Sequence, residues 1–338
     1  MRVWRKVKFL LGSLFFIGSA ASAQDVHFSQ QYATKLRLNP AFVGLTGEAN
    51  VTAAYRSQWS TLPGAFTSSH LSGDMRFGES KSSGGILMMH DKAGSSAFTT
   101  FELSGVYGYH TKISKNFAVS AGLAATYGSR KIDFGSLTFG DQLSDDGLIS
   151  ETSQESTIYY DPVKYLSLAA GGILYSDQFW LSIGTFHMNQ PDLGFTQDSR
   201  LPLKVVANAG YKFYASTHTS QNKFYELSFT PTATYTRQQP FSKLDLGLYT
   251  LYTPVTVGIL YRGLNLSGQY EQSIVFITGV QLNQFKFAYS YDLGLRGLSA
   301  NAGGTHEISL TFEQNDLTKI FRARATNKNY MQIACPAF

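Results

Sequence analysis

Histidine, serine and acidic side chains are the residues of this chain that could do chemistry, and they form no recognisable catalytic pattern. The seven histidines are scattered along the sequence, at His27, His70, His90, His110, His187, His218 and His306. Nucleophilic catalysis needs a base within hydrogen-bond reach of its nucleophile, and no signature of such a pair is present. No HExxH, CxxC or EF-hand spacing occurs either. We therefore expect no enzyme, no cofactor and no metal site.

Two isolated features have both a chemical and an ordinary interpretation. Asp145 and Asp146 could bind Ca²⁺, but such a site needs six or more oxygens, so a solvated pair of loop residues is favoured. Cys335 is the single cysteine, which excludes an intrachain disulfide. Without neighbouring catalytic partners, we expect a free thiol or a mixed disulfide there.

The elements that must position these residues are strands, because apolar and small polar residues alternate along most of the chain. In segment 117–127, Phe117, Leu123 and Tyr127 share one face, while Ser120 and Thr126 share the other. The segments run about 9–14 residues and carry aromatic residues towards their ends, which suits strands that cross a bilayer at a tilt. This favours a transmembrane β-barrel over a soluble β-sandwich. The barrel must be closed, because an open edge in lipid leaves backbone groups unpaired.

We predict an all-β fold, a transmembrane antiparallel up-and-down β-barrel of about 14 strands with periplasmic N- and C-termini. The predicted strands are 49–57, 67–77, 84–91, 98–111, 116–129, 164–175, 178–188, 203–214, 224–236, 243–252, 254–262, 273–283, 285–292 and 305–312. Short connections alternate with long ones, as periplasmic turns alternate with external loops in such barrels. Twelve and sixteen strands stay open as alternatives.

The two ends of the chain complete the predicted organisation. Residues 1–23 have a basic head, an apolar stretch and a final Ala-Ser-Ala, which predicts a signal peptide. Residues 24–47 form a periplasmic or lumenal segment, residues 48–312 the outer-membrane barrel, and residues 313–338 a periplasmic tail. Without the signal, 28 basic residues less four leaves 24 against 23 acidic ones. This near-neutral balance gives no indication of a nucleic-acid partner.

The charged residues predicted to face the lumen alternate in sign. They are Arg56, Asp74, Arg76, Glu102, Lys204, Lys212, Glu226, Asp245, Arg262, Lys286, Asp292 and Glu307. No ring of a single sign is present that would select an ion. We favour an ion-paired filling of a closed barrel over a gated lumen. The Asn39-Pro40 turn either lies inside this lumen as a plug or only marks a turn.

A series of short motifs resembles the PorP/SprF family of type IX secretion system membrane proteins. The motifs occur in order at Asp25–Tyr32, Leu38–Gly44, Tyr55–Trp59, Phe186–Pro191, Ser290–Asp292, Gly304–Leu310 and Cys335-Pro336. We select from them, as structural or partner-binding candidates, Asn39, Pro40, Tyr55, Arg56, Trp59, His187, Asn189, Pro191, Tyr291, Asp292, His306, Glu307, Cys335 and Pro336.

This resemblance implies an outer-membrane barrel of the type IX secretion and gliding pathway. Its members support export or surface anchoring of proteins through their C-terminal sorting domains. The implied partners are the lipid bilayer, a sorting domain at the external loops, and periplasmic secretion or gliding machinery at the N- and C-terminal segments. The acidic loop Arg130–Val163 is the best candidate platform for a protein ligand. The alternative function is a passive porin or a transporter of hydrophobic ligands.

Overall fold

The computed structural model describes most of the chain between Asp25 and Gln314. The described residues are 25–61, 64–77, 80–94, 98–133, 138–144, 147–148, 150, 153, 160–195, 198–220, 223–239, 241–265, 272–296, 302–314 and 333. The described residues include three short helical segments, α2 (Lys35–Leu38), η2 (Pro40–Phe42) and η4 (Gly140–Gln142). The strands are β1 (Ala49–Gln58), β2 (Phe66–Arg76), β3 (Ser82–Ala93), β4 (Phe98–Lys112), β5 (Ala118–Lys131), β6 (Leu143–Ser144), β7 (Gly147–Leu148), β8 (Val163–Tyr175), β9 (Phe179–Phe186), β10 (Lys204–Tyr211), β11 (Phe213–Ser220), β12 (Lys223–Gln238), β13 (Phe241–Tyr252), β14 (Val255–Asn265), β15 (Ser273–Leu282), β16 (Phe285–Gly294) and β17 (Thr305–Gln314).

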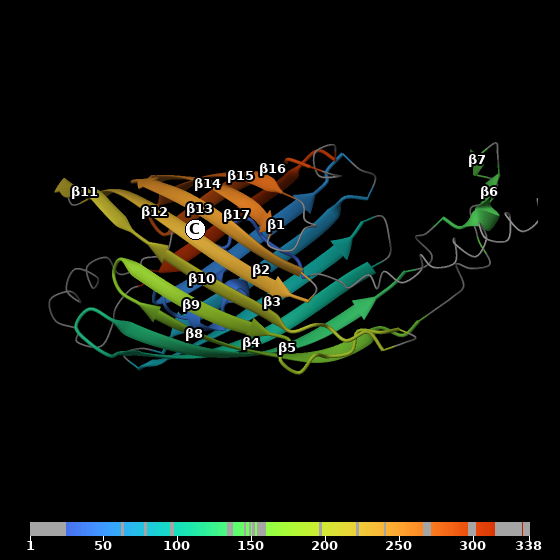
Figure 1. Cartoon of the computed structure of the whole chain (residues 1–338), viewed down its shortest axis with the longest axis horizontal. Helices are drawn as coiled ribbons and strands as arrows, with labels where there is room; N and C mark the ends of the chain where they lie inside the picture. The colour runs from blue at the N-terminus through green and yellow to red at the C-terminus, as the bar shows by residue number, and fades with distance from the viewer. Residues whose placement is uncertain are drawn as a thin grey trace, which may run out of the picture.

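Apart from β6 and β7, the strands form one antiparallel wall that closes on itself (Figure 1). The first strand, β1, pairs with the last, β17, along its whole length. The remaining gap closes where β10 pairs with β12. Because β11 continues β10 beyond Lys212, the 15-stranded sheet makes a barrel of 14 strands. The predicted antiparallel barrel fold and its strand number are confirmed, and the periplasmic position of the termini stays a prediction.

Most strand ends lie within three residues of the predicted ones, and three differences stand out. Strand β9 ends at Phe186, not at residue 188, because His187 has a φ of 56°, a left-handed conformation that ends an extended strand. The predicted strand 203–214 divides at Lys212, and its continuation β11 turns the predicted connection 215–223 into part of a long hairpin. The loop between β5 and β8 holds the small hairpin β6–β7, whose strands of two residues are too short to show a period of two.

The two ends of the barrel differ in the length of their connections. At one end, β8 and β9 are joined by residues 176–178, and β13 and β14 by residues 253–254. At the opposite end, 31 residues (132–162) join β5 to β8. Strand β1 begins and β17 ends at the short-connection end, because Ala49 pairs with Gln314.

No helix in the described part of the chain is long and apolar enough to cross a bilayer.

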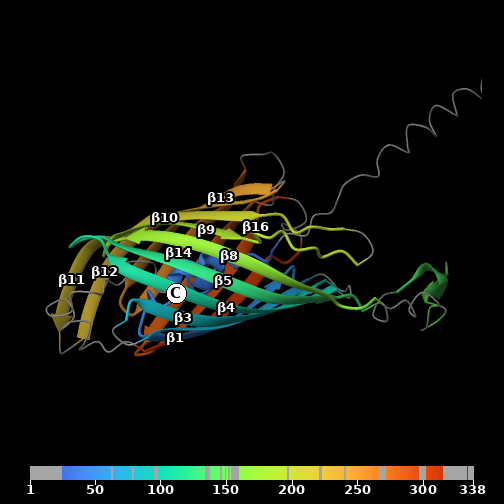
Figure 2. The same cartoon turned by 90° about the horizontal axis from the view of Figure 1, so that it is seen from below.

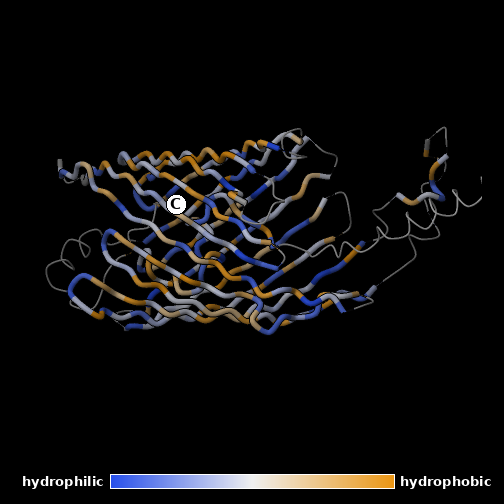
Figure 3. The backbone as a smooth tube through the Cα atoms, viewed as in Figure 1, coloured by the Kyte–Doolittle hydropathy of each residue, from blue (hydrophilic) through white to orange (hydrophobic). Residues whose placement is uncertain are grey.

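Apolar residues recur along the strands of the wall (Figure 3), and many of the large ones are exposed on its outer face. Among them, Ile86 is 60% exposed, Leu123 63% and Ile308 55%. Their neighbours along the strands, such as Ser120, are buried towards the inside. The alternation predicted for segment 117–127 is therefore confirmed. This arrangement places apolar groups against lipid and polar groups in the lumen, as a barrel in a membrane requires.

The core of the molecule lies inside the barrel and is built around residues 25–46, which we call the plug. Most plug residues are buried, and Phe42, Val43 and Leu45 have no exposed surface. Phe42 belongs to an apolar cluster that also contains Trp180 from the wall. Ile333, the one described residue beyond Gln314, is buried in the same cluster. Figures 1 and 2 both show the plug surrounded by strands.

Candidate functional site: the plug inside the barrel

The plug runs the length of the lumen. At its start, Asp25 contacts His187 and Lys204, which flank the long connection between β9 and β10. Towards its end, the N–H of Gly44 donates to Asp74 near the short-connection end of β2, at 2.8 Å. Contacts with the wall occur between these two points as well. The plug therefore spans the barrel from the long-connection end to the short-connection end.

Glu307 of β17 fixes the backbone of the plug at one point. Its two carboxylate oxygens accept the backbone N–H groups of Ser29 and Gln30 at 2.8 and 2.9 Å. Arg56 of β1 lies 3.3 Å from the same carboxylate, which has no exposed surface. Hydrogen bonds to an ionised acceptor are about twice as strong as neutral ones. Glu307 thus holds two successive plug residues in one register.

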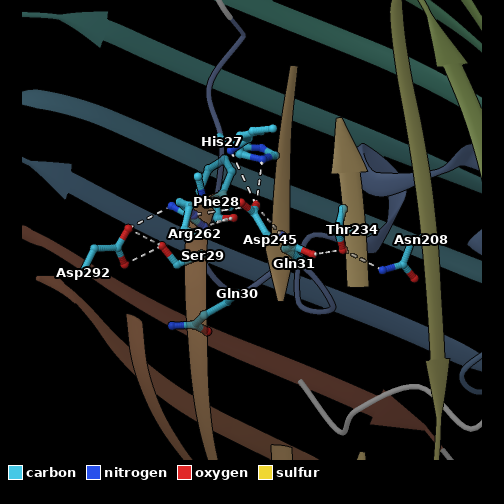
Figure 4. Close-up of polar contacts among 12 residues, drawn as sticks. His27, Phe28, Ser29, Gln30, Gln31, Asn208, Thr234, Asp245, Arg262 and Asp292 are labelled. Carbon is cyan, nitrogen blue, oxygen red and sulfur yellow. Dashed lines mark hydrogen bonds and ion pairs between the residues drawn. The ribbon is translucent and has the colours of Figure 1, made fainter. Parts of the chain in front are cut away.

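Asp292 of β16 makes the adjoining contact, to a plug side chain (Figure 4). The hydroxyl of Ser29 donates to this carboxylate at 2.6 Å and accepts from Arg56 at 2.8 Å. Arg262 of β14 donates to Asp292 at 2.9 Å and to the carbonyl of Phe28 at 3.0 Å. Both guanidinium groups face carboxylates, so the buried charges in this part of the lumen are paired.

Asp245 of β13 contacts two further plug residues, His27 and Gln31 (Figure 4). It accepts the side-chain amide of Gln31 at 3.3 Å and the backbone N–H of Gly263 at 3.0 Å. The Nε2 atom of His27 lies 3.6 Å from the same carboxylate. Burial, with an added contribution from Lys243, lowers the pKa of His27 well below 6.5, although Asp245 opposes the shift. His27 is therefore neutral while the plug is in place.

Asp25 locks the start of the plug to the wall. Its carboxylate lies 2.9 Å from Nε2 of His187 and accepts from Lys204 at 3.0 Å. Burial alone would raise the pKa of Asp25, but Lys204 and His187 hold it well below 3.8. Nδ1 of His187 lies 2.9 Å from the hydroxyl of Ser167. Although this is a Ser–His–Asp order, Ser167 is only 4% exposed, so a substrate has no access to the hydroxyl in this arrangement.

The Asn39-Pro40 turn lies against the wall where two glycines leave room for it. The side chain of Asn39 accepts the N–H of Ala41 at 2.8 Å and so caps η2. A Cβ on Gly171 of β8 would lie 2.0 Å from Oδ1 of Asn39, and one on Gly122 of β5 would lie 2.4 Å from the backbone nitrogen of Ala41. The plug backbone therefore approaches the wall more closely than any side chain allows.

Two basic residues of α2 pair with acidic residues of the wall. Lys35 lies 3.0 Å from Asp74, and Arg37 lies 3.2 Å from Glu102. The hydroxyl of Tyr165 also donates to Glu102, at 2.8 Å. These residues are mostly buried, and removing one partner would leave an unpaired charge in the lumen. The predicted ion-paired filling is present, and in these two pairs the basic partner comes from the plug.

The motif residues selected from the sequence divide between the lumen and other places. Those that join plug and wall are Asn39, Pro40, Arg56, His187, Asp292 and Glu307. Tyr55 is instead 44% exposed on the outer face. Trp59 follows β1 and packs edge-on against Phe66, with ring centroids 5.0 Å apart.

The remaining motif residues are local. Asn189 accepts the N–H of Leu168 and donates to the carbonyl of Leu166, so it ties the loop after β9 to β8. The carbonyl of Pro191 accepts the N–H of Leu201 within that loop. The Tyr291 and His306 rings lie 5.0 Å apart on β16 and β17. Cys335, Pro336, Asp145 and Asp146 lie outside the described residues.

The selection from sequence missed the plug residues that carry most contacts, Asp25, Ser29 and Gln30. All three stand within the quoted motif Asp25–Tyr32, whose consecutive polar residues Ser29-Gln30-Gln31, outside any alternating segment, were the available signal. Among the described residues, no three His, Cys, Asp or Glu side chains lie close enough together to hold a metal ion.

A shallow apolar hollow of about 1040 Å³ lies over strands β1 to β8. Its lining includes the exposed side chains of Val51, Ile86 and Leu123. Gly105 also lines it, and a Cβ there would meet no atom within 4 Å. These exposed residues belong to the outer face of the barrel.

A protein-family model described as type IX secretion system membrane protein PorP/SprF matches residues 20–312. A comparison with curated proteins finds no match. Similar solved structures include the outer membrane protein Omp33 of Acinetobacter baumannii, with 10% identity, 80% of this chain and 100% of that chain covered, and a TM-score of 0.42. They also include the toluene transporter TbuX of Ralstonia pickettii, with 11% identity, 88% and 96% covered, and a TM-score of 0.46. The toluene transporter TodX of P. putida has 10% identity, 82% and 93% covered, and a TM-score of 0.45.

Proposed function

This chain belongs to the PorP/SprF family of type IX secretion system membrane proteins, and from that premise we propose that it supports the secretion or surface anchoring of proteins that carry C-terminal sorting domains. It is a β-barrel of the bacterial outer membrane. In this proposal the sorting domain binds the long connections, which face outwards, and the acidic segment 130–163 is the largest of them. The periplasmic machinery binds the short-connection end and the tail after Gln314.

The observation that carries the proposal is the occupied lumen. The plug spans the barrel, and buried ion pairs such as Lys35–Asp74 and Arg37–Glu102 join it to the wall. A passive porin needs a continuous aqueous path, and the plug occupies the lumen in which that path would run. An occupied barrel suits a protein that acts through its loops and ends, as a partner in secretion does. While the plug is in place, its own side chains are not available to a periplasmic partner.

Deletion of the protein from its native host tests the proposal. We expect a protein with a C-terminal sorting domain to accumulate in the periplasm or to be shed into the medium, and the full-length chain supplied in trans to restore its surface location. Cell fractionation and surface labelling measure both. In a host that glides, loss of gliding is a second readout. If export and attachment are untouched while uptake of small or hydrophobic solutes falls, the transporter alternative replaces this proposal.

Purification from mild detergent provides an independent test. We expect the full chain to co-purify with a sorting-domain protein or with a subunit of the secretion machinery, identified by mass spectrometry. A barrel lacking most of segment 132–162 should lose the sorting-domain protein and keep the periplasmic partner. Repeated recovery of the barrel alone would contradict a partner-based role.

A further inference from the structure

One strand of the barrel continues beyond its neighbour and leaves a backbone edge open. Strand β10 pairs with β9 as far as Tyr211 and Phe179, and the N–H of Lys212 then donates to the carbonyl of Gln178 at 2.7 Å. Beyond this point the chain continues as β11, which pairs with β12. In the strand order of the described residues β11 stands last, with no strand on its other side.

The open edge projects from the short-connection end of the barrel. The last backbone contact of β12 on the β13 side joins the N–H of Thr253 to the carbonyl of Glu226 at 3.0 Å, so residues Ser216–Ser220 and Lys223–Tyr225 of the hairpin extend past both neighbouring strands. Figures 1 and 2 show β11 and β12 at that end of the barrel, where they extend past the adjacent ends of β9 and β13. Unpaired backbone groups are not tolerated in lipid, so this edge lies in water. With the long connections outside, it faces the periplasm.

The sequence of β11 lacks the features that usually protect a strand edge from pairing. Residues 213–220 read Phe-Tyr-Ala-Ser-Thr-His-Thr-Ser, without proline, lysine, arginine or an acidic residue. Every residue from Phe213 to Thr219 is exposed. One bulge occurs at Ala215, and pairing with β12 is regular from Ser216 to Ser220. Natural proteins blunt exposed edges with charges, prolines or short strands, because a bare edge is a template for another strand.

We propose that the open edge of β11, from Ser216 to Ser220, binds an extended segment of a periplasmic protein by β-strand addition. Backbone hydrogen bonds supply the affinity, and the uncharged hydroxyl and aromatic side chains of β11 select a segment that is itself uncharged and rich in β-branched or aromatic residues. A second copy of this chain is a poorer occupant. Two copies in one membrane point the same way, so their β11 edges cannot pair antiparallel, which is the more stable arrangement.

This inference rests on the proposed function, because it takes the bound segment to come from the periplasmic machinery. A photo-crosslinking amino acid at Thr217, in the full chain in intact cells, tests it. We expect one periplasmic protein to be captured from Thr217. The same probe at Asn116, which is exposed in the turn between β4 and β5 at the same end of the barrel, should not capture it.

Proline substitutions separate strand addition from simple proximity. Successive N–H groups of a strand point to opposite edges, so one of Thr217→Pro and His218→Pro removes a donor from the open edge and the other removes one that faces β12. We expect at least one of them to lower the yield of the cross-link, formed from a probe at Thr219, by about tenfold or more, with a normally folded barrel on heat-modifiability gels.

Three outcomes would overturn the inference: an unchanged cross-link in both proline variants, a cross-link to a second copy of the barrel, or one to residues 315–332 of the same chain. Secretion separates this inference from the proposed function. If both proline variants secrete normally and Thr217 captures nothing, while deletion of the whole protein blocks export, only the strand-addition proposal fails. If deletion leaves export intact, the proposed function fails.

Discussion

At the residue scale, Glu307 should contribute more to the stability of the plugged barrel than other acidic residues. It is fully buried, accepts two backbone N–H groups from Ser29 and Gln30, and pairs with Arg56. In Glu307→Gln one carbonyl oxygen replaces two charged acceptors, and the new amide N–H₂ faces a backbone donor. Because removing one partner of a buried pair leaves an uncompensated charge, we expect a loss of about 3 kcal/mol.

Protease accessibility of the plug and the heat-modifiability midpoint would measure this loss. Asp177→Asn is the matched control, since Asp177 is an exposed acidic residue in the turn between β8 and β9. Equal midpoints and equal cleavage rates for the two variants would contradict the role given to Glu307.

Acid should release the plug through His27. Its pKa is well below 6.5 in the buried position, while a released, hydrated His27 regains about the ordinary value. The released state therefore binds more protons, and plug binding weakens as the pH falls below about 6.5. The groups facing His27 include Lys243, Asp245 and Arg262. Asp25 acts in the same direction at lower pH, because its depressed pKa stabilises the bound plug above about 3.8 and that stabilisation is lost towards the lowered value.

Cleavage of the plug at about pH 7.5 and about pH 5.5 tests this in detergent-solubilised protein. Cleavage should be faster at the lower pH, and His27→Gln should reduce the difference. His218→Gln, at an exposed histidine of β11, should leave the difference unchanged. A pH effect of the same size in His27→Gln would assign it to other groups.

At the element scale, η2 packs against the wall at two glycines, Gly122 of β5 and Gly171 of β8. A Cβ on Gly122 would lie 2.4 Å from the backbone of Ala41, whereas one on Gly105, on the outer face of β4, would meet nothing within 4 Å. We expect Gly122→Ala to destabilise the plugged barrel by about 2 kcal/mol, as overpacking does. Gly105→Ala should be neutral or slightly stabilising, because glycine in a strand costs about 0.5–1 kcal/mol relative to alanine. Thermal unfolding of the two variants in one detergent compares them, and equal midpoints would show that η2 can move away without cost.

The elements of the wall could be predicted from sequence, whereas the contacts of the plug could not. Alternation is local, so Leu123 and Ser120 of β5 identify their faces without knowledge of any other strand. The same parity places Arg56, Asp292 and Glu307 inside. Their contact partners in the plug could not be predicted, because Ser29 and Glu307 are separated by 278 positions and no sequence period connects them. The break at Lys212 also leaves no local signal, since residues on both sides of it continue to favour a strand.

At the scale of the whole molecule, the plug makes a wide barrel into a filled one. Barrels of about 8 strands are filled by their own side chains, whereas those of 16 to 18 enclose a water channel. A wall of 14 strands therefore has room that its side chains alone do not fill. Residues 25–46 occupy that room. Their basic residues Lys35 and Arg37 form ion pairs with acidic residues of the wall, Asp74 and Glu102. The plug and the wall therefore share one buried interior, although the plug precedes the first strand in the sequence.

If the plug fills the lumen, ion conductance should depend on it. The full chain in planar lipid bilayers should show no steady open channel, because the plug in place interrupts the aqueous path. The double variant Asp292→Asn, Glu307→Gln keeps the shape of both side chains but weakens the hold on Ser29, so brief openings should appear. A chain without residues 25–46, if it assembles, should conduct steadily, and a synthetic peptide of those residues should suppress its current. Gly105→Ala should behave as the full chain does. Steady conductance of the unaltered protein would mean that the plug leaves an aqueous path beside it. The passive-porin function would then be favoured over the proposed role in secretion.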